Sequence, residues 1–224
     1  MKLFITQNSY YFMHRFFLDI YEKENCKIIY VIEKKRGGFK KIKEILKTFG
    51  FWNFVRILIL EFKFFILLNG RVKKIDSVKI TDIELNNELG KTLTKFDFDC
   101  LFSIGCPTKI DASLQYNFKI PFYNLHGGIL PIQKGRFSPI KALKKNDKYL
   151  GGSLHLISKS FDDGEVISQK FFEPDNKNKL SNYVKVLEIC KKLLEDFFKE
   201  KTEIIPKKIL KEIRKLLKSI FFLS

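Results

Sequence analysis

The sequence has few residues of the kinds that form disulfides or bind metal ions. It contains four cysteines and three histidines among 224 residues. The cysteines form no Cys-x-x-Cys pair and have no histidine nearby, which argues against both a zinc site and a disulfide framework. We therefore expect no metal, and we interpret the cysteines as reduced, small apolar core residues of a cytoplasmic protein. They are Cys26, Cys100, Cys106 and Cys190.

Arginine is scarce although the chain is strongly basic. The formal net charge is +17, but only six of the 42 basic residues are arginines. Arginine is the side chain best suited to bidentate contacts with phosphates and bases, so its scarcity argues against recognition of a specific nucleic acid. The abundance of lysine, phenylalanine, isoleucine and asparagine is typical of an AT-rich genome, and we favour this explanation of the charge.

Long uncharged apolar stretches are also lacking. The first apolar run, residues 2–6, is too short for a signal peptide, and no cleavage site follows it. Residues 51–68 are far more apolar, but Arg56, Glu61 and Lys63 interrupt them. A charge at the centre of a spanning helix costs about 2.5–3.5 kcal/mol. We expect a helix that packs its broad apolar face on a sheet, and a helix facing a membrane surface or a partner is the alternative.

The order of the apolar runs predicts an α/β fold. A short strand at 2–6, a helix at 10–24 and a buried strand at 27–32 are typical of a parallel sheet with a right-handed crossover. No Gly-x-Gly-x-x-Gly motif follows the first strand, so a dinucleotide cofactor is not supported. Further strands are predicted at 73–83, 98–105, 120–126, 151–157 and 165–172, and further helices at 34–47, 83–96, 137–145 and 180–199. The fold class that follows is a mostly parallel sheet flanked by helices.

Polar residues follow two of the predicted strands. Asn124 and His126 come at the end of an apolar run and two residues apart, so their side chains point to the same side of the strand. Asp162 lies 38 positions after Asn124, in a polar turn bounded by Gly164. An amide, an imidazole and a carboxylate are the groups of a site that transfers a proton and stabilises an oxyanion.

These residues belong to an ordered set of motifs, Asn124-x-His126, Leu130-Pro131, Gly135-x-x-x-Pro139-Ile140-x-Ala142 and Asp162-x-Gly164. The set resembles the folate-dependent formyltransferases. This family includes methionyl-tRNA formyltransferase, glycinamide ribonucleotide formyltransferase and the nucleotide-sugar N-formyltransferases. The resemblance is dense over residues 95–170 and thin over 1–35. It implies a Rossmann-like catalytic domain over residues 1–178 and leaves 179–224 as a C-terminal helical extension.

The resemblance also implies a role for each residue of the site. N10-formyltetrahydrofolate would be the formyl donor, and no metal would be needed. His126 would take the proton of the attacking amine or hydrogen-bond the tetrahedral intermediate. Asn124 would donate to the oxyanion, and Asp162 would orient His126. Asp163 adjoins Asp162, and only the resemblance favours Asp162.

Further residues are predicted to bind the two substrates. In the relatives, the backbone of the loop after the strand 98–105 holds the pterin ring of the folate; a plain strand-to-helix connection is the alternative here. The predicted donor-binding residues are Pro107, Thr108, Lys109, Ile110, Ser158 and Phe161. Asn8 and Ser9, in the turn after the first strand, and Lys134 and Arg136, beside the Gly127-Gly128 turn, are predicted to bind the acceptor. Ordinary turn formation is the alternative for Asn8 and Ser9.

The predicted acceptor is a nucleotide-linked amino sugar used in surface-glycan or lipopolysaccharide synthesis. Purine enzymes of the family usually have Pro-Ser where this chain has Gly127-Gly128, and the pair is similar to that of enzymes acting on 4-amino-4,6-dideoxy sugars. The chain is expected to end before the additional domain of the tRNA enzymes. The family usually has an aromatic residue followed by arginine before the glycine of this motif, whereas this chain has Gln133-Lys134 before Gly135. A tRNA or purine-precursor acceptor, and a catalytically silent basic module that binds RNA or membrane, remain alternatives.

Residues 206–224 are predicted to form a basic amphipathic helix. Its apolar residues recur at helical spacing, and six basic residues with Glu212 occupy the other face. Three interpretations remain open: packing on the protein's own core, a homodimer contact, or docking on anionic lipid. The last would place a cytoplasmic enzyme at the inner membrane face.

Overall fold

The computed structural model describes residues 1–7, 11–24, 26–34, 37–82, 84–174 and 178–199. It divides into two compact units. The first comprises Met1–Leu125 and Leu156–Gly164, and the second comprises His126–His155 and the residues from Glu165 onward. Asn8, Ser9 and the predicted helix at 206–224 lie outside the described residues. The predicted domain boundary between residues 178 and 179 stays a prediction.

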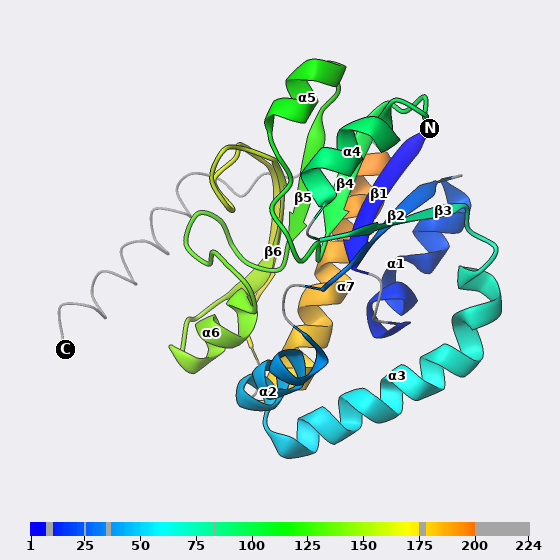
Figure 1. Cartoon of the computed structure of the whole chain (residues 1–224). Helices are drawn as coiled ribbons and strands as arrows, with labels where there is room; N and C mark the ends of the chain where they lie inside the picture. Colours follow the sequence, from blue (N-terminus) through cyan, green and yellow to red (C-terminus); the bar gives the residue numbers. More distant parts are fainter. Residues whose placement is uncertain (8–10, 25, 35–36, 83, 175–177, 200–224) are drawn as a thin grey trace. The chain divides into compact units, whose positions relative to one another are not determined.

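The first unit contains five parallel strands in the spatial order β3-β2-β1-β4-β5 (Figure 1). β1 pairs with both β2 and β4, so the chain starts in the middle of this sheet and moves outward in each direction. That order, reversing at the first strand, is the order of doubly wound α/β folds. The predicted fold class is confirmed. The strands are β1 (Lys2–Gln7), β2 (Lys27–Ile32), β3 (Ser77–Thr81), β4 (Cys100–Ile104) and β5 (Phe122–His126).

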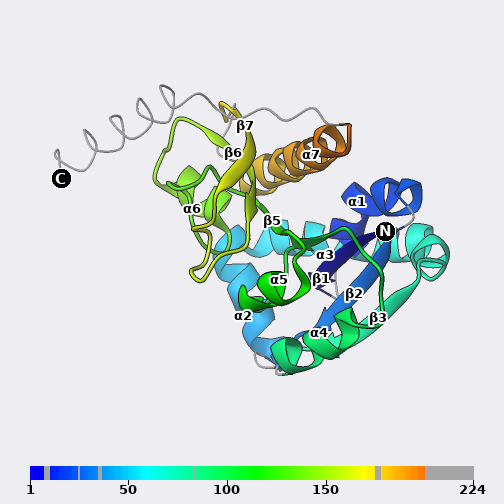
Figure 2. The same cartoon turned by 90° about the horizontal axis from the view of Figure 1, so that it is seen from above.

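Helices cover both faces of this parallel sheet, because alternate strand residues point to opposite sides. Leu3 and Ile5 of β1 join a buried cluster with Leu85 and other leucines of α4. Phe4, between them, packs its ring 4.8 Å from that of Tyr21 on α1. Figure 2 shows α1 and α4 on opposite sides of the strands. The helices are α1 (Tyr11–Lys23), α2 (Gly37–Phe49), α3 (Phe51–Val72), α4 (Leu85–Leu93) and the unpredicted α5 (Ser113–Phe118).

The packing predicted for residues 51–68 is wrong. These residues do form a helix, but Phe64 is its only fully buried side chain among the described residues. The helices that α3 packs against are α1 and α2. Arg71 fixes the end of α3 to α1, since its guanidinium donates to Asp19 at 3.0 Å and to Glu22. Because α3 packs on other helices, no sheet covers the apolar side chains on its remaining sides. Of the described helices, none is long and apolar enough to cross a membrane.

The second unit is built from an antiparallel strand pair and two helices. β6 (Leu150–Leu156) pairs with β7 (Val166–Phe172), with an irregularity between Leu154 and His155. α6 (Ser138–Lys144) and β7 both pack against the long α7 (Lys179–Phe198). Asn178 caps α7, because its side-chain oxygen accepts from the backbone N–H groups of Leu180 and Ser181. The strands and the helices predicted for this region are confirmed.

The four cysteines are free, as predicted. Cys26, Cys100 and Cys190 are buried, and Cys106 is half-buried. Burial raises the pKa of the Cys190 thiol to about 12, and it raises the pKa of Cys26 to about 12 as well. These thiols therefore stay protonated near neutral pH and are poor nucleophiles.

Candidate active site

His126, the last residue of β5, is held by one of its two ring nitrogens. The Nε2 atom lies 2.7 Å from the backbone oxygen of Gln133 and 3.2 Å from the hydroxyl oxygen of Ser138. A carbonyl oxygen can only accept, so Nε2 must carry a proton. In the neutral ring the lone pair is then on Nδ1. The ring is buried, with that of His155 edge-to-face at 6.4 Å between centroids. These contacts fix the orientation of the ring.

Gln133 organises the loop that follows His126. Its side-chain oxygen accepts from the backbone N–H of Ile129 at 3.1 Å. Its side-chain nitrogen donates to a carboxylate oxygen of Asp147 at 3.1 Å and to the backbone oxygen of Tyr149 at 2.8 Å. Only 7% of Gln133 is exposed. The residue that departs from the family pattern in sequence thus has a defined structural task, which is to fix the backbone oxygen that holds His126.

Two serines satisfy the backbone of the Gly127-Gly128 turn. The Ser138 hydroxyl donates to the backbone oxygen of Gly127 at 2.6 Å, and the Ser153 hydroxyl donates to that of Gly128 at 2.6 Å. Since the Ser138 hydroxyl is already donating, its lone pairs face the Nε2–H of His126 as acceptors. Gln169 extends the network, because its side-chain nitrogen donates to the Ser153 hydroxyl and to the Leu130 backbone oxygen, both at 2.8 Å. The turn beside His126 is therefore rigidly supported by buried hydrogen bonds.

Gly128 is the tightest position of the turn. A Cβ atom added there would lie 2.4 Å from the Gln133 backbone oxygen, 2.6 Å from the Ser138 hydroxyl and 2.7 Å from His126 Nε2. No side chain fits at these distances without moving the imidazole or the backbone that holds it. Glycine at 128 is what allows His126, Gln133 and Ser138 to meet.

The Asp147 side chain connects this network to the pH dependence of folding. Burial is the largest effect on this carboxyl and raises its pKa, while the bond from Gln133 opposes the shift. Its other oxygen is buried without a hydrogen-bond partner. The fold thus favours the protonated form. The contribution of the Asp147 carboxyl to the stability of the fold is therefore fully present below the pKa that it has in the unfolded chain. This contribution is lost as the pH rises through its raised pKa in the folded protein.

We therefore expect Asp147→Asn to stabilise the protein at pH 7.5, because asparagine can accept from Gln133 without burying a charge. The gain in melting temperature should shrink at pH 4, where the wild-type carboxyl takes up its proton. Melting curves at the two pH values measure this difference. Asp97→Asn removes an exposed carboxylate and is the matched control. A gain for Asp147→Asn that is equal at both pH values would contradict the explanation.

The other two residues of the predicted catalytic set lie in the first unit. Asn124 is half-buried on β5, where it is in register with Ser103 of β4. Asp162 is 9% exposed and has a positive φ of 51°, in the loop that follows β6. Asp163, in contrast, is exposed. The difference in burial favours Asp162 over Asp163 as the functional carboxylate, in agreement with the choice made from the resemblance. The assignment of all three catalytic residues stays a prediction.

The two segments predicted to bind the formyl donor lie side by side in the first unit. Lys109 donates to the backbone oxygen of Lys159, and its ammonium lies 5.7 Å from the centroid of the Phe161 ring. The Gln115 side chain donates to the backbone oxygen of Ile157 at 3.0 Å. These contacts join the loop after β4 to the segment after β6. Pro107, Thr108 and Lys109 are half-buried there, Ile110 is buried, Ser158 is half-buried and Phe161 is 66% exposed.

The backbone of the loop after β4 suits the edge of a pterin ring. Within the described part of the chain, no protein acceptor is hydrogen-bonded to the backbone N–H groups of Lys109 or Ile110. The Lys109 backbone oxygen is held by the Asn86 side chain at 3.1 Å, which fixes the loop without using those donors. Main-chain donors on a supported loop can read a ligand edge whatever the side chains are. The residues present therefore fit the donor that the resemblance implies.

The predicted acceptor-binding residues are only partly placed. Lys134 is exposed, and the half-buried Arg136 guanidinium lies 5.5 Å from the Phe137 ring centroid. Asn8 and Ser9 lie outside the described residues. Across the described ranges, no group of three or more His, Cys, Asp or Glu side chains is arranged to hold a metal ion.

No family model matches the chain, but comparisons with individual proteins agree with one another. Over 148 residues the chain is 31% identical to the methionyl-tRNA formyltransferase of Mycoplasma mycoides subsp. mycoides SC. That region is 62% of this chain and 46% of the relative, so the match spans less than half of that enzyme's length.

Solved structures give the same result for the fold. The phosphoribosylglycinamide formyltransferase of Anaplasma phagocytophilum superposes with a TM-score of 0.62 at 14% identity, over 87% of this chain and 83% of that one. A sugar N-formyltransferase from a Shewanella species gives 0.56 at 16% identity, over 92% and 73%. A 4-N formyltransferase from Francisella tularensis gives 0.53 at 18% identity, over 91% and 72%. The resemblance to the folate-dependent formyltransferases is thereby confirmed, and the chain has the formyltransferase fold.

Proposed function

We propose that this protein transfers the formyl group of N10-formyltetrahydrofolate to the amino group of a nucleotide-linked amino sugar. The observation that carries the proposal is the buried His126, whose Nε2 donates to the Gln133 backbone oxygen and faces the Ser138 hydroxyl, so that the ring is held at the end of β5. Such a fixed imidazole, next to Asn124 on the same strand, is suited to deprotonating an amine as it attacks a carbonyl carbon.

Each residue has one task in this chemistry. The formyl donor supplies the carbonyl carbon, to which the amine nitrogen bonds as the bond to the folate nitrogen breaks. His126 accepts the proton that the amine loses and returns it to the leaving nitrogen. The Asn124 amide N–H donates to the carbonyl oxygen as negative charge develops on it, and Asp162 orients His126. An oxyanion donor is typically worth about 10²–10³ in rate, and a positioned base about 10²–10⁴.

The donor would bind on the first unit, along the loop after β4 and the segment after β6. The backbone of residues 107–110 would hold the pterin edge, and the exposed Phe161 ring offers an apolar surface beside Lys109. The rings of a pterin are flat and partly apolar, so an aromatic face next to fixed polar groups suits them.

The sugar acceptor is supported by the turn at Gly127-Gly128. A pair with a side chain at its second position, such as the Pro-Ser usual in purine enzymes of the family, would collide with His126 and Gln133. A Pro-Ser pair would therefore not fit this turn as it stands. Methionyl-tRNA is the second candidate, because the curated relative at 31% identity bears the name of the tRNA enzyme.

Incubating the full-length protein with N10-formyltetrahydrofolate and a panel of amines tests both candidates. The panel contains nucleotide-linked amino sugars, methionyl-tRNA and glycinamide ribonucleotide, and mass spectrometry detects the gain of one formyl group. Transfer to an amino sugar alone is the expected result. Transfer to methionyl-tRNA alone would replace the proposed acceptor. Salt-dependent RNA binding without folate binding would show a basic binding module and overturn the enzyme proposal.

Arg136 is proposed to bind the diphosphate of the sugar nucleotide. A guanidinium makes charge-assisted hydrogen bonds with phosphate oxygens that are roughly twice as strong as neutral ones. Arg136→Ala should therefore raise the KM for the sugar nucleotide by about tenfold or more while the KM for the folate barely changes. Lys144→Ala, an exposed residue of α6, is the matched control. Equal rises in both KM values would mean that Arg136 shapes the turn instead.

We further propose that the enzyme works in the cytoplasm and that it does not bind a specific nucleic acid. The homodimer contact and the lipid contact of residues 206–224 stay predictions, since those residues lie outside the described ones.

A further inference from the structure

Helices α2 and α3 together present a large exposed apolar surface. Eight large apolar side chains of α3 are between 44% and 77% exposed, and Phe39 on α2 is 81% exposed. Contiguous apolar surface of this kind marks a binding site more often than a chance feature. We call it the α2–α3 surface, and its apolar members are Phe39, Ile42, Phe51, Trp52, Leu58, Ile59, Phe62, Phe65, Ile66 and Leu67.

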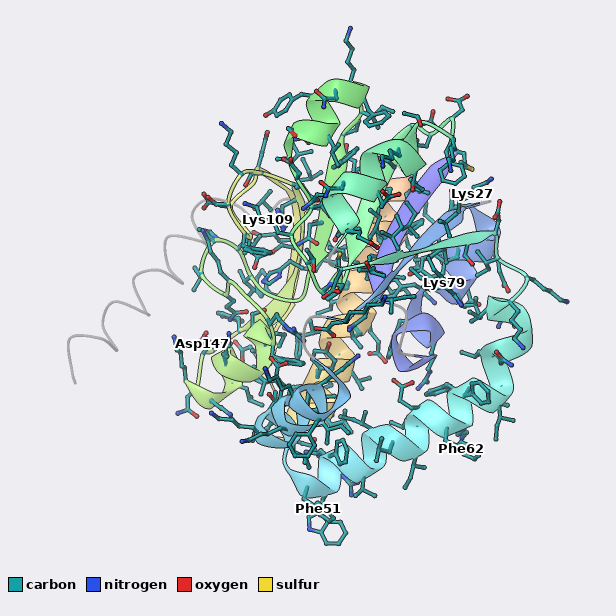
Figure 3. The ribbon with its side chains drawn as sticks, in the orientation of Figure 1. Lys27, Phe51, Phe62, Lys79, Lys109 and Asp147 are labelled. Atoms are coloured by element: carbon teal, nitrogen blue, oxygen red, sulfur yellow. The ribbon has the colours of Figure 1, made fainter. Side chains whose placement is uncertain are left out.

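The exposed apolar residues lie opposite the face that attaches α3 to the protein. Phe64 is buried beneath the guanidinium of Arg15, which lies 5.0 Å from its ring centroid, and Arg71 bonds to α1. Phe51, Leu58, Phe62 and Phe65 recur at spacings of three, four or seven, which places them on one other face. Figure 3 labels Phe51 and Phe62 on the side of α3 turned away from the strands. α3 is therefore anchored along one side and apolar along the other.

Positive charge borders this surface. Lys40, Lys43 and Lys47 are exposed and follow helical spacing, so they form one stripe along α2. Arg56 and Lys63 are exposed and seven residues apart, which is about two helical turns, so they lie together on one side of α3, near Trp52, Ile59 and Leu67. The two helices contain seven basic and two acidic residues. An apolar face with a basic border is complementary to lipid chains beneath anionic headgroups.

We propose that the α2–α3 surface binds an anionic phospholipid bilayer, with α3 lying in the plane of the membrane. Its 22 residues span about 33 Å, at about 1.5 Å of rise each. The helix lies flat because Arg56, Glu61 and Lys63 interrupt it, and its aromatic residues suit the interface, where a ring sits among the headgroups. This inference is independent of the reaction proposed above and of residues 206–224.

The positive charge beside the α2–α3 surface argues against two other binding partners. A second copy of the chain would bring its own lysine stripe and a net charge of +17 against this one. Residues 206–224 carry six basic residues and one acidic residue, so they too have the same sign as the border of the surface. An anionic bilayer complements both the apolar residues and the charge.

Trp52 gives a direct test with the unmodified full-length protein. It is the only tryptophan of the chain and is 77% exposed. On adding phosphatidylcholine vesicles with 30% phosphatidylglycerol at low salt, its emission should shift to the blue and acrylamide quenching should fall. Pure phosphatidylcholine vesicles should change neither. Vesicle binding that leaves Trp52 emission unchanged would assign binding to another region and overturn the proposal. Emission that is already blue-shifted without vesicles would show that protein covers the surface, and would overturn it too.

Vesicle sedimentation of two variants tests the apolar residues and the basic residues of the α2–α3 surface separately. Phe62→Asp should abolish binding, whereas Tyr116→Asp, which changes an equally exposed aromatic on α5, should not. Reversing Lys40, Lys43 and Lys47 to Glu should weaken binding by at least about 100-fold, because each basic residue near an anionic surface contributes about fivefold. The same reversal at the exposed Lys79, Lys95 and Lys119 should have a much smaller effect. Wild-type binding by Phe62→Asp, with an unchanged melting curve, would refute the proposal. A dimer that this variant dissociates would instead assign the surface to a second copy.

Discussion

His126→Asn is expected to reduce kcat by at least about 10², because it removes the only group of the site proposed to take the amine proton. Asparagine can still donate toward the Gln133 backbone oxygen, so the loop and the melting temperature should change little. Single-turnover rates of formyl transfer measure the chemical step separately from product release. A variant that keeps the wild-type single-turnover rate would mean that His126 is structural.

The other two predicted catalytic residues, Asn124 and Asp162, can be tested in the same way, with Asp163 as the control. Asn124→Ala and Asp162→Asn should each lower kcat by at least about 10², and double variants should lose little more, because the three residues act as a unit. Asp163→Asn, which changes an exposed carboxylate next to the buried one, should retain most of the activity. The opposite pattern for Asp162 and Asp163 would move the catalytic assignment by one residue.

The sequence predicts strands and site residues where they belong to a recognisable local pattern. Strand positions follow from runs of apolar residues, and β2 has the predicted bounds of 27 and 32. Asn124 and His126 could be found because they lie two apart at the end of such a run. The supporting residues could not be found in this way. Gln133, Ser153 and Gln169 are far apart in sequence, and a lone serine or glutamine carries no pattern until the fold brings it to the turn.

The error over α3 has a different origin. An apolar pattern says that a helix face avoids water, but it does not say which neighbour covers it. Residues 51–68 are apolar on nearly all sides, so the pattern favoured full burial against a sheet. In the structure the helix is attached through Phe64 and Arg71 to α1, and its other apolar face stays exposed. Tertiary packing, which depends on residues such as Arg15 and Asp19 in another helix, decided the outcome.

Gly128→Ala should have an effect as large as the loss of the catalytic histidine, although the glycine takes no part in the chemistry. The new methyl group would lie 2.4–2.7 Å from the Gln133 oxygen, the Ser138 hydroxyl and His126 Nε2, so at least one of them must move. A displacement of about 1 Å at a reacting group can cost about 10² in rate. Overpacking of this kind also destabilises a fold by about 1–3 kcal/mol, which a lower melting temperature would show.

Gly127→Ala separates this steric effect from a general intolerance of the turn. Its added methyl group would lie 3.3 Å from a methyl carbon of Val186 and 3.7 Å from a ring carbon of Pro139, both on side chains that can give slightly. We therefore expect Gly127→Ala to keep kcat within about tenfold of wild type, and Gly128→Ala to lose at least about 10². Equal losses in the two variants would show that the turn needs flexible backbone rather than space beside His126. Full activity in Gly128→Ala would mean that the catalytic histidine tolerates displacement, and the role assigned to its Nε2 contacts would have to be abandoned.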